Sequence, residues 1–507
     1  MRQVNRWAVL IVLSAALAII SLDNTIVNVA LPRLQEDLGA STSQLQWVVD
    51  AYSVMFAGSL LLAGSLGDRF GRRKMLLVGL VIFTTGSLLA VFVNQATTLT
   101  LCRAMMGVGG AFIMPSTLSI LVQVFKEPKE RAQAIGTWAA VAGLGVAIGP
   151  IVGGLLLEHF TWHAIFWVNP PIAVAVIVAV VMFVPESADQ TKPRLDLIGA
   201  LLSGLGLVAL VVTIIELPEV GIDAFTIGAA LCAVVFLVGF VLWEKRVPRP
   251  LLPMQYFKER LFSSSIVIVA LVYFALMGAM FFLPQFLQLV KGMSPLESGI
   301  AVLPGAGGLL LASLVSPRLA ERFGTRNLVV VGMSIVTAGM LAFSYLQTDT
   351  PYMVIALVFG SIGAGLGLTL PQATNGVLAS VPTERSGMGS AVNDAMSELG
   401  GSFGVAILGA TMSIFYRHNI EQAIAYAGDK VTLLPPQALE AARESLAAAS
   451  LEAARIPDSV GAIYRQVAGE AFVTGMTWAL FIGAIISFLG VLVAWKFLPK
   501  HVERVEE

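Results

Sequence analysis

The segment Gly64–Leu80, GSLGDRFGRRKMLLVGL, returns in weaker form at Ser316–Met333, SPRLAERFGTRNLVVVGM. Each copy is a short basic loop between two long apolar runs. Four positions of the first copy have a like residue in the second: Asp68 with Glu321, Arg69 with Arg322, Gly71 with Gly324, and Arg73 with Arg326. This is the pattern of a membrane carrier built from two like halves, each presenting its tight turn to the same side. The repeat therefore indicates a transporter.

The composition excludes an ordinary water-soluble protein. Of the 507 residues, 57% are hydrophobic and only 12% are charged, whereas soluble domains carry about 25% charged residues. Fourteen apolar runs reach about 18 residues or more, enough to span a bilayer. They lie near residues 8–30, 45–66, 75–93, 97–123, 131–157, 163–184, 196–216, 224–243, 262–290, 296–316, 326–346, 352–380, 386–416 and 470–498. Because lipid admits only segments whose backbone groups are satisfied internally, we expect an all-α polytopic membrane protein with 14 transmembrane helices.

The spacing of the repeat predicts two six-helix bundles with two further helices between them. Residues 1–186 are expected to form the first bundle, residues 187–258 the inserted pair with its polar hinges, and residues 259–507 the second bundle. The inserted pair is interpreted as a buttress, because it holds no charge inside except Glu216 near one end.

One long polar connection, residues 417–469, lies within the second bundle. Its segment Gln437–Ile456 is rich in Ala, Leu and Glu, which predicts an external helix. A solvated connector and a lid or partner-docking segment are both open interpretations of this loop.

The basic residues predict the orientation of the chain. Of the 31 Lys and Arg, 23 lie on the side that carries both termini, seven lie on the other side, and Arg103 lies within a run. Cytoplasmic loops are enriched in Lys and Arg, so both termini are expected in the cytoplasm, with the chain in the plasma or inner membrane. The first run continues past Asp23 to Leu31, so we interpret it as a spanning helix and not as a signal peptide. Cys102 and Cys232 both fall in helices, and no structural disulfide is expected.

Five ionisable residues lie inside the expected helices: Asp23, Asp50, Arg103, Asp394 and Glu398. Each costs about 2.5–3.5 kcal/mol at the centre of a membrane helix, so each needs a reason to be there. Asp394 and Glu398 are four residues apart and share one helix face. One hypothesis is a cavity between the halves where carboxylates exchange protons and bind cationic solutes. The alternative is a buried ion pair, such as Asp23 with Arg103, that only holds helices together.

The basic loop is a candidate inner gate. Its glycines permit a tight reversal, and its charged residues can bind helix ends or the opposite half, with Asp68 able to cap a helix N-terminus. The candidate gate residues are Gly64, Asp68, Arg69, Gly71 and Arg72. Positive-inside topology alone would explain Arg72, Arg73 and Lys74, but not the spacing or its repetition.

The fifth run, AVAGLGVAIGPIVGGLL, is unusually rich in small residues. Small side chains at four-residue spacing let helices approach closely, and a proline removes one backbone bond and kinks the helix. The residues concerned are Gly145, Gly149, Pro150, Gly153 and Gly154. Either a rocking interface or plain helix packing fits this pattern.

Several kinds of site have no sequence support. No GxxxxGK[ST] loop is present, so the sequence predicts no nucleotide-driven motor. His159 and His163 have metal-like spacing but are interpreted as structural residues at a turn. No nucleophile–base constellation appears, so we expect no enzyme, no cofactor, no metal and no nucleic-acid partner.

The motifs together resemble the major facilitator superfamily. They are LDNTIVNVALPRL, WVVDAYSVMFAG, GSLGDRFGRRK, LCRAMMGVGGA, GLGVAIGPIVGG and GSAVNDAMSELGGSFGVAILG. With fourteen expected helices, the chain is similar to the fourteen-helix drug:proton antiporters, such as the staphylococcal quaternary-ammonium efflux pumps. The resemblance covers all fourteen expected helices.

The resemblance implies proton-driven export of lipophilic, mostly cationic drugs by alternating access. It assigns proton-coupling or substrate roles to Asp23, Asp50, Arg103, Asp394 and Glu398, the inner gate to Asp68, Arg69 and Arg72, and the antiporter role above all to Gly149 and Pro150. The chain departs from those pumps in one respect, since GIAVLPGAGGLLLASLVSP has no acid before Glu321. We therefore expect a monomeric proton-coupled exporter, with export of an endogenous metabolite, lipid or siderophore as the first alternative and a membrane receptor or scaffold using loop 417–469 as the second.

Overall fold

The computed structural model describes residues 5–186, 196–247, 250, 254–381, 386–427, 434–453, 455–456 and 458–500. Every regular element in this part of the chain is a helix, which confirms the all-α prediction. Residues before the inserted pair form α1 (Arg6–Leu38), α2 (Thr42–Phe70), α3 (Arg72–Ala90), α4 (Ala96–Val124), α5 (Pro128–His159), α6 (Ala164–Trp167) and α7 (Asn169–Phe183). The inserted pair is α8 (Leu197–Val220) and α9 (Ala224–Glu244). We call α1–α7 the first half.

The second half runs from a short 3-10 turn, η1 (Tyr256–Lys258), to α18. It contains α10 (Arg260–Gln285), the π-helical turn η2 (Phe286–Val290), α11 (Pro295–Ala301), α12 (Leu303–Phe323), α13 (Thr325–Ser344), α14 (Tyr352–Ala379), α15 (Ser386–Ala427), α16 (Pro436–Glu444), α17 (Leu446–Ala453) and α18 (Asp458–Phe497). Among the described residues, twelve helices are long and apolar enough to cross a membrane, against the fourteen spans expected from the sequence.

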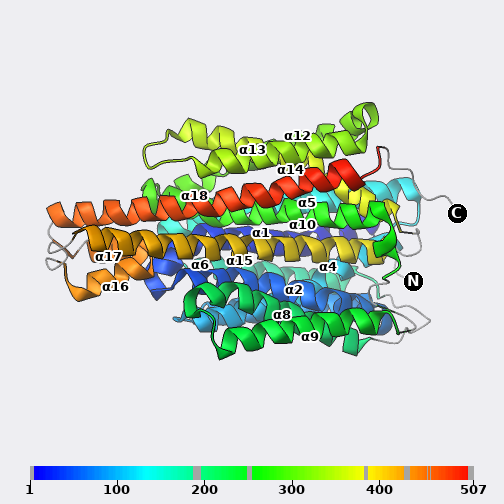
Figure 1. The fold of residues 1–507 in the computed structure, drawn as a ribbon. Coiled ribbons are helices and arrows are strands. Elements are labelled where there is room, and N and C mark those ends of the chain that lie inside the picture. Colours follow the sequence, from blue (N-terminus) through cyan, green and yellow to red (C-terminus); the bar gives the residue numbers. More distant parts are fainter. Residues whose placement is uncertain are drawn as a thin grey trace.

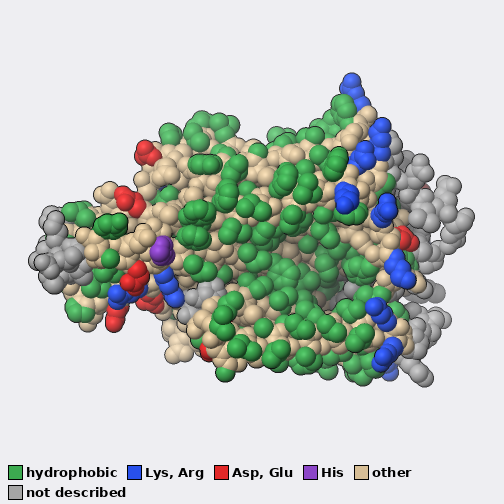
Figure 2. Space-filling model, viewed as in Figure 1, with side chains coloured by type: hydrophobic (Ala, Val, Ile, Leu, Met, Phe, Trp, Pro, Cys, Tyr) green, Lys and Arg blue, Asp and Glu red, His purple; other side chains and the backbone are tan. Residues whose placement is uncertain are grey.

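The helices run along the long axis of the molecule (Figure 1). The start of α1 and the end of α18 lie at one end, which we call the terminal end, and α16 and α17 lie at the other, which we call the loop end (Figure 1). Figure 2 shows a broad apolar belt between the ends, with Lys and Arg side chains gathered toward the terminal end of the visible face. The belt is the surface that a bilayer would cover.

The sequence repeat is also a repeat of structure. Gly71 ends α2 and begins α3 with a φ of 112°, and Gly324 does the same between α12 and α13 with a φ of 85°. Their amides donate to Gly67 O at 3.0 Å and to Ala320 O at 2.8 Å, closing the preceding helix. Positive φ is strained for residues with a side chain, so these turns need glycine. The predicted tight reversal is confirmed in both copies.

Three expected continuous helices are interrupted. The run near 163–184 divides into α6 and α7 at Val168, just before Asn169-Pro170-Pro171, and the run near 296–316 divides into α11 and α12 at Val302, close to Pro304. The prolines lack the amide that a continuous helix requires. The third interruption, at the end of α10, is the π turn η2.

The prediction of a single external helix at Gln437–Ile456 is wrong. Two helices, α16 and α17, meet at Ser445, whose backbone is extended. Its hydroxyl accepts a hydrogen bond from Ala448 N at 3.1 Å, as a helix N-cap does, so Ser445 starts a new helix instead of continuing the old one. The loop is also shorter than 417–469, because α15 continues to Ala427 and α18 begins at Asp458.

Most of the close helix contacts join helices of the same half. In the first half, α5 packs on α1, and α4 packs on α2 and α3. In the second half, α15 packs on α10, α14 on α12 and α13, and α18 on α13 and α15. The halves meet chiefly through α2 with α15 and α5 with α11, and α8 contacts both α2 and α15. Cys102 and Cys232 are both free.

Candidate functional site

Asp23 and Arg103 form a buried ion pair between α1 and α4. Arg103 Nη1 donates to Asp23 Oδ2, and Arg103 Nε donates to the carbonyl of Val48 on α2 at 3.1 Å. The side chains are 0% and 1% exposed. A buried charge left without a partner is very costly, so each residue requires the other.

Asn169, at the start of α7, supplies a second donor to the same carboxylate. Its Nδ2 lies 2.8 Å from Asp23 Oδ1 and 3.1 Å from Ser87 Oγ, and Ser87 in turn donates to Phe166 O at 2.8 Å. Asp23 therefore has a donor on each oxygen. Sequence reasoning missed Asn169, although an amide within FWVNPPI was a visible signal.

Tyr52 of α2 covers the guanidinium of Arg103. The Arg103 Cζ lies 4.5 Å from the centre of the Tyr52 ring, a cation–π geometry. Gly107 makes this approach possible, because a methyl group there would lie 2.2 Å from the Tyr52 carbonyl oxygen. Tyr52 was also missed, and its only sequence signal is a phenol in the middle of WVVDAYSVMF.

Asp50 lies between Val48 and Tyr52 on α2, which both contact Arg103, but its own carboxyl group does not join the ion pair. Its side chain is 0% exposed, and neither carboxyl oxygen has a hydrogen-bond partner within the described residues. The side chain of Ser402 on α15 lies beside the carboxyl group. Asp50 thus belongs to the contact between the halves.

Asp394 and Glu398 lie on α15 and are partly exposed, unlike Asp23 and Asp50. The side chains of Asn24 on α1 and Ser53 on α2 lie beside the Glu398 carboxylate, although Glu398 belongs to the second half. Tyr273 of α10 lies near both acids. The structure therefore brings all five candidate residues into one region between α1, α2, α4, α10 and α15.

Three hydrogen bonds join the basic loop to α4, to α7 and to Glu186 just beyond α7. Arg72 Nη1 donates to Ser119 O at 3.2 Å, and Arg73 Nη2 donates to Val181 O at 2.8 Å. Glu186 approaches the start of α3, where its Oε1 accepts from Arg73 N at 3.2 Å. Arg69 is exposed and lies against the Phe70 ring, and Gly64 faces Pro115 of α4.

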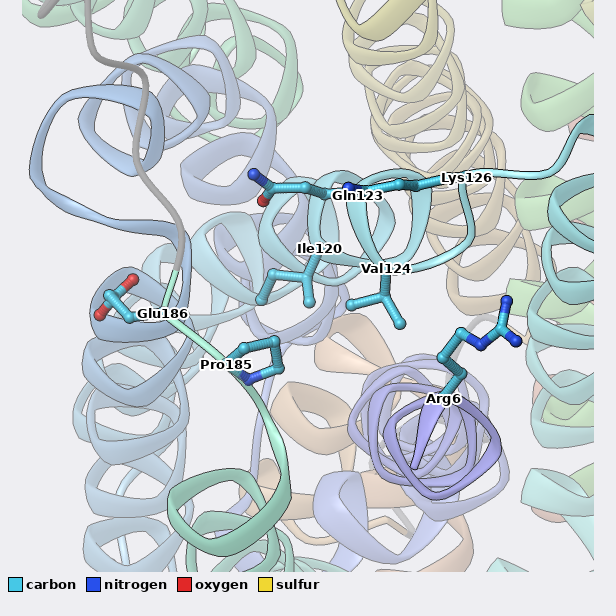
Figure 3. Close-up of a pocket in the computed structure, with 7 residues that line it drawn as sticks. All are labelled: Arg6, Ile120, Gln123, Val124, Lys126, Pro185 and Glu186. Atoms are coloured by element: carbon cyan, nitrogen blue, oxygen red, sulfur yellow. The ribbon is translucent and has the colours of Figure 1, made fainter. Parts of the chain in front are cut away.

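The helix cap predicted for Asp68 cannot be assigned, since its side chain lies outside the described residues. The cap observed on α3 comes from Glu186, which is remote in sequence. A hollow of about 390 Å³ adjoins this region at the terminal end. Figure 3 shows Arg6 and Glu186 on opposite sides of it, with Ile120 and Val124 of α4 between them.

The glycines of α5 serve two contacts. Three of them bring α5 close to α1, where a methyl group added to the glycine would collide with an α1 side chain. That methyl group would lie 2.8 Å from Ser21 Cβ if added at Gly145, 2.0 Å from Thr25 Oγ1 if added at Gly149, and 2.8 Å from Ile26 Cγ1 if added at Gly153. The other contact crosses between the halves. A methyl group at Gly154 would lie 2.5 Å from Pro295 O, and one at Gly299 would lie 2.2 Å from Pro150 O.

Two glutamines join the halves through hydrogen bonds. Gln288 Nε2 in η2 donates to Val29 O of α1 at 2.9 Å, and Gln46 Nε2 in α2 donates to Val405 O and Ala406 O of α15 at 3.2 and 3.1 Å. Together with the contact between α5 and α11, these bonds hold the halves together toward the loop end. No group of three His, Cys, Asp or Glu that could hold a metal occurs among residues with described positions.

Comparisons with known proteins agree with this architecture. The sequence model of the Major Facilitator Superfamily matches residues 13–405. The chain is 36% identical over 480 residues to the multidrug efflux pump LfrA of Mycolicibacterium smegmatis, a match that covers 95% of this chain and 94% of LfrA. It is 32% identical to the tetracenomycin C resistance and export protein of Streptomyces glaucescens, over 96% of this chain and 91% of that protein. It is 29% identical to the methyl viologen resistance protein SmvA of Salmonella typhimurium, over 99% of this chain and 100% of SmvA.

A similar solved structure is that of a bacterial homologue of the human lysosomal transporter Spinster, inward-facing and unoccupied. The TM-score is 0.68 at 17% sequence identity, and the match covers 97% of this chain and 98% of that one. This likeness concerns the fold. The family match over most of the chain, supported by relatives of similar length, shows that the chain belongs to the major facilitator superfamily of membrane transporters.

Proposed function

We propose that the chain is a proton-coupled multidrug antiporter that exports lipophilic, mostly cationic compounds by alternating access. The observation that carries the proposal is the position of Glu398 and Asp394, two partly exposed carboxylates of the second half placed against α1, α2 and α10. The names of the relatives LfrA and SmvA, a multidrug efflux pump and a methyl viologen resistance protein, support cargo of this class.

The candidate residues differ in solvent exposure, and we assign their roles accordingly. Glu398 and Asp394 are partly exposed, and they would bind the positive charge of the cargo. Asp23 and Arg103 are buried away from solvent and form an ion pair with each other, so their role would be to hold α1, α2 and α4 in position. Asp50 is buried at the contact between halves, where it would hold a proton in one arrangement and release it in the other.

The arrangement in the membrane is part of the same proposal. The two expected spans that are missing from the twelve fall on α2 and α5, helices of 29 and 32 residues. If these two also cross the membrane, as we propose, the chain would have fourteen spans, grouped as six, two and six. The Lys- and Arg-rich terminal end would face the cytoplasm of a plasma or inner membrane, with both termini inside. The contacts of α5 with α11 and the bond from Gln288 to Val29 would then lie on the outer side. We propose a monomer without enzymatic activity.

Efflux of ethidium from loaded cells tests the proposal. Wild type should expel the dye until a protonophore is added, and Asp394→Asn should slow efflux because a carboxylate that attracts the cation is lost. Asp37→Asn is the matched control, since it makes the same change at an exposed position outside the site. Lack of efflux by well-expressed wild type would contradict the proposal and favour an endogenous metabolite as cargo.

A further inference from the structure

The inserted helix α8 lies across the line where the two halves meet. It packs on α2 of the first half and on α15 of the second half. Its side chains Val211 and Ile215 share one buried apolar cluster with Val54 of α2 and Ala406 of α15. A helix that only shielded one bundle from lipid would not need to contact both.

The contact with α2 is close and includes a polar bond. Trp47 Nε1 of α2 donates to Glu216 Oε1 of α8 at 2.8 Å. Further along the same two helices, a methyl group at Gly58 would lie only 3.1 Å from the Gly204 Cα, so the backbones nearly touch. These two contacts, one near each end of the crossing, fix α8 to the first half.

The contact with α15 is of a different kind. In the cluster described above it is made by apolar side chains, with Ala406 and Phe403 of α15 against Val211 and Ile215 of α8. Apolar packing has no directional bonds to break, so such surfaces can slide past each other. The two sides of α8 therefore differ in how firmly they are held.

Asp50 lies at the junction of these three helices. Trp47 and Val54 are three residues before it and four after it, and both belong to the cluster that α8 covers. Ser402, beside the Asp50 carboxyl, lies one turn from Ala406 of the same cluster. Asp50 is 0% exposed, and on α2 it lies between two residues that pack in the cluster with α8.

We infer that α8 is a working part of the transport site: it is clamped to α2 by Glu216 and Trp47, it moves with the first half, and it slides on α15 while it seals Asp50 from the surrounding lipid and outer water. Glu216 and Trp47 are therefore positioning residues that act through Asp50. This inference rests on the proposed proton-coupled transport and assigns the inserted pair a part in it.

The clamp is tested by removing its hydrogen bond. Trp47→Phe and Glu216→Met, which each remove one partner of the bond, should each lower protonophore-sensitive ethidium efflux by roughly tenfold or more, as expected for a hydrogen bond to a charged group. Because Asp50 would be less well sealed, they should also shift the pH profile of efflux. Trp243→Phe is the matched control, because Trp243 Nε1 makes the same kind of bond, to Asp196 Oδ1 at 2.8 Å, but within the inserted pair. A lower rate with an unmoved pH profile, or an equal effect of Trp243→Phe, would overturn the inference.

The movement is tested without measuring transport. Spin labels would replace three exposed residues in the full chain in nanodiscs, with Cys102 and Cys232 changed to Ser: Gln95 in the first half, Ile222 beside α8 and Tyr426 in the second half. Between pH 5.5 and 8, or on adding ethidium, the distance from Ile222 to Gln95 should stay constant while the distance from Ile222 to Tyr426 changes. The reverse pattern, or no change in either distance, would contradict the inference. Efflux by the unlabelled protein tests the proposed function separately.

Discussion

Arg103 on α4 donates to the carboxylate of Asp23 on α1, and Asn169 of α7 donates to the other oxygen of the same carboxylate. The pair is almost completely withdrawn from solvent, at 1% and 0% exposure. Three helices of the first half are thereby joined around one charge. Since both oxygens of Asp23 are engaged, an incoming cation would meet Glu398 more readily than Asp23.

Removing only the Arg103 charge from this pair should destabilise the fold more than removing both charges. Arg103→Gln leaves the Asp23 carboxylate buried without its cation, which costs about 3–5 kcal/mol. The double variant Asp23→Asn/Arg103→Gln leaves no buried charge, so its melting temperature in detergent should exceed that of Arg103→Gln. Arg455→Gln, which breaks a surface pair of Arg455 with Glu452, is the control and should change stability by about 1 kcal/mol or less. A double variant less stable than Arg103→Gln would contradict this account.

Gly107 is required for the approach of Tyr52 to Arg103. Gly107→Ala places a methyl group where the Tyr52 carbonyl oxygen lies 2.2 Å away, so α2 and α4 must separate. Overpacking of this kind costs about 1–3 kcal/mol, and thermal unfolding of the purified protein should show it. Gly228→Ala in α9 should be neutral or stabilising, because nothing lies within 4 Å of a methyl group there. Equal melting temperatures for the two variants would show that the helix contact is looser than described.

Asp223 caps the N-terminus of α9 and makes the stability of the first turn of this helix depend on pH. Its Oδ1 accepts from Thr226 N at 2.8 Å, and this backbone hydrogen bond lowers the pKa of the carboxyl. A folded pKa below the unfolded value adds stability above the unfolded pKa, and the stability is lost as the pH falls through the folded pKa. Hydrogen exchange in the first turn of α9 should therefore be slower in wild type than in Asp223→Asn at pH 7. The two should converge below about pH 4, near the ordinary Asp pKa. A difference that is the same at pH 7 and pH 3 would exclude a role of the charge.

The sequence predicted the helices well because a span of lipid imposes length and apolarity on each one. It did not predict the breaks at Val168, Val302 and Ser445, since proline tolerance near a helix start and capping by serine depend on the path of the neighbouring chain. It singled out Asp23, Asp50, Arg103, Asp394 and Glu398, because a charge among apolar residues is rare and easily recognised; their roles in transport stay predictions.

The partners of those residues were harder to foresee. Asn169 and Tyr52 are polar but uncharged, so they do not stand out in an apolar run, and only the fold brings them to Asp23 and Arg103. Glu186 shows the same difficulty at the basic loop. The contact at the start of α3 comes from a residue beyond the end of α7, which no local spacing could indicate.

Gln288 is expected to stabilise the state in which the halves meet at the loop end. Its bond to Val29 O crosses between the halves at 2.9 Å and must break when that end opens. Gln288→Ala removes about 0.5–1.5 kcal/mol from this state, so the opposite state should become roughly two- to tenfold more populated. Gly154→Ala should act in the same direction, because a methyl group there would lie 2.5 Å from Pro295 O of α11.

The fraction of molecules in which the loop end is open can be measured from the accessibility of the site to a thiol reagent. A cysteine at Asn24, beside Glu398, would be labelled by a membrane-impermeant maleimide added outside cells, in a chain with Cys102 and Cys232 changed to Ser. Labelling should be faster in Gln288→Ala and Gly154→Ala than in their parent. Gln422→Ala is the control, since Gln422 bonds only to His418 on its own helix in the contacts described, at 3.0 Å. If Gln288→Ala labelled no faster than Gln422→Ala, the bond to Val29 would be a passive contact, and the energy that holds the loop end closed would have to come from the packing of α5 on α11.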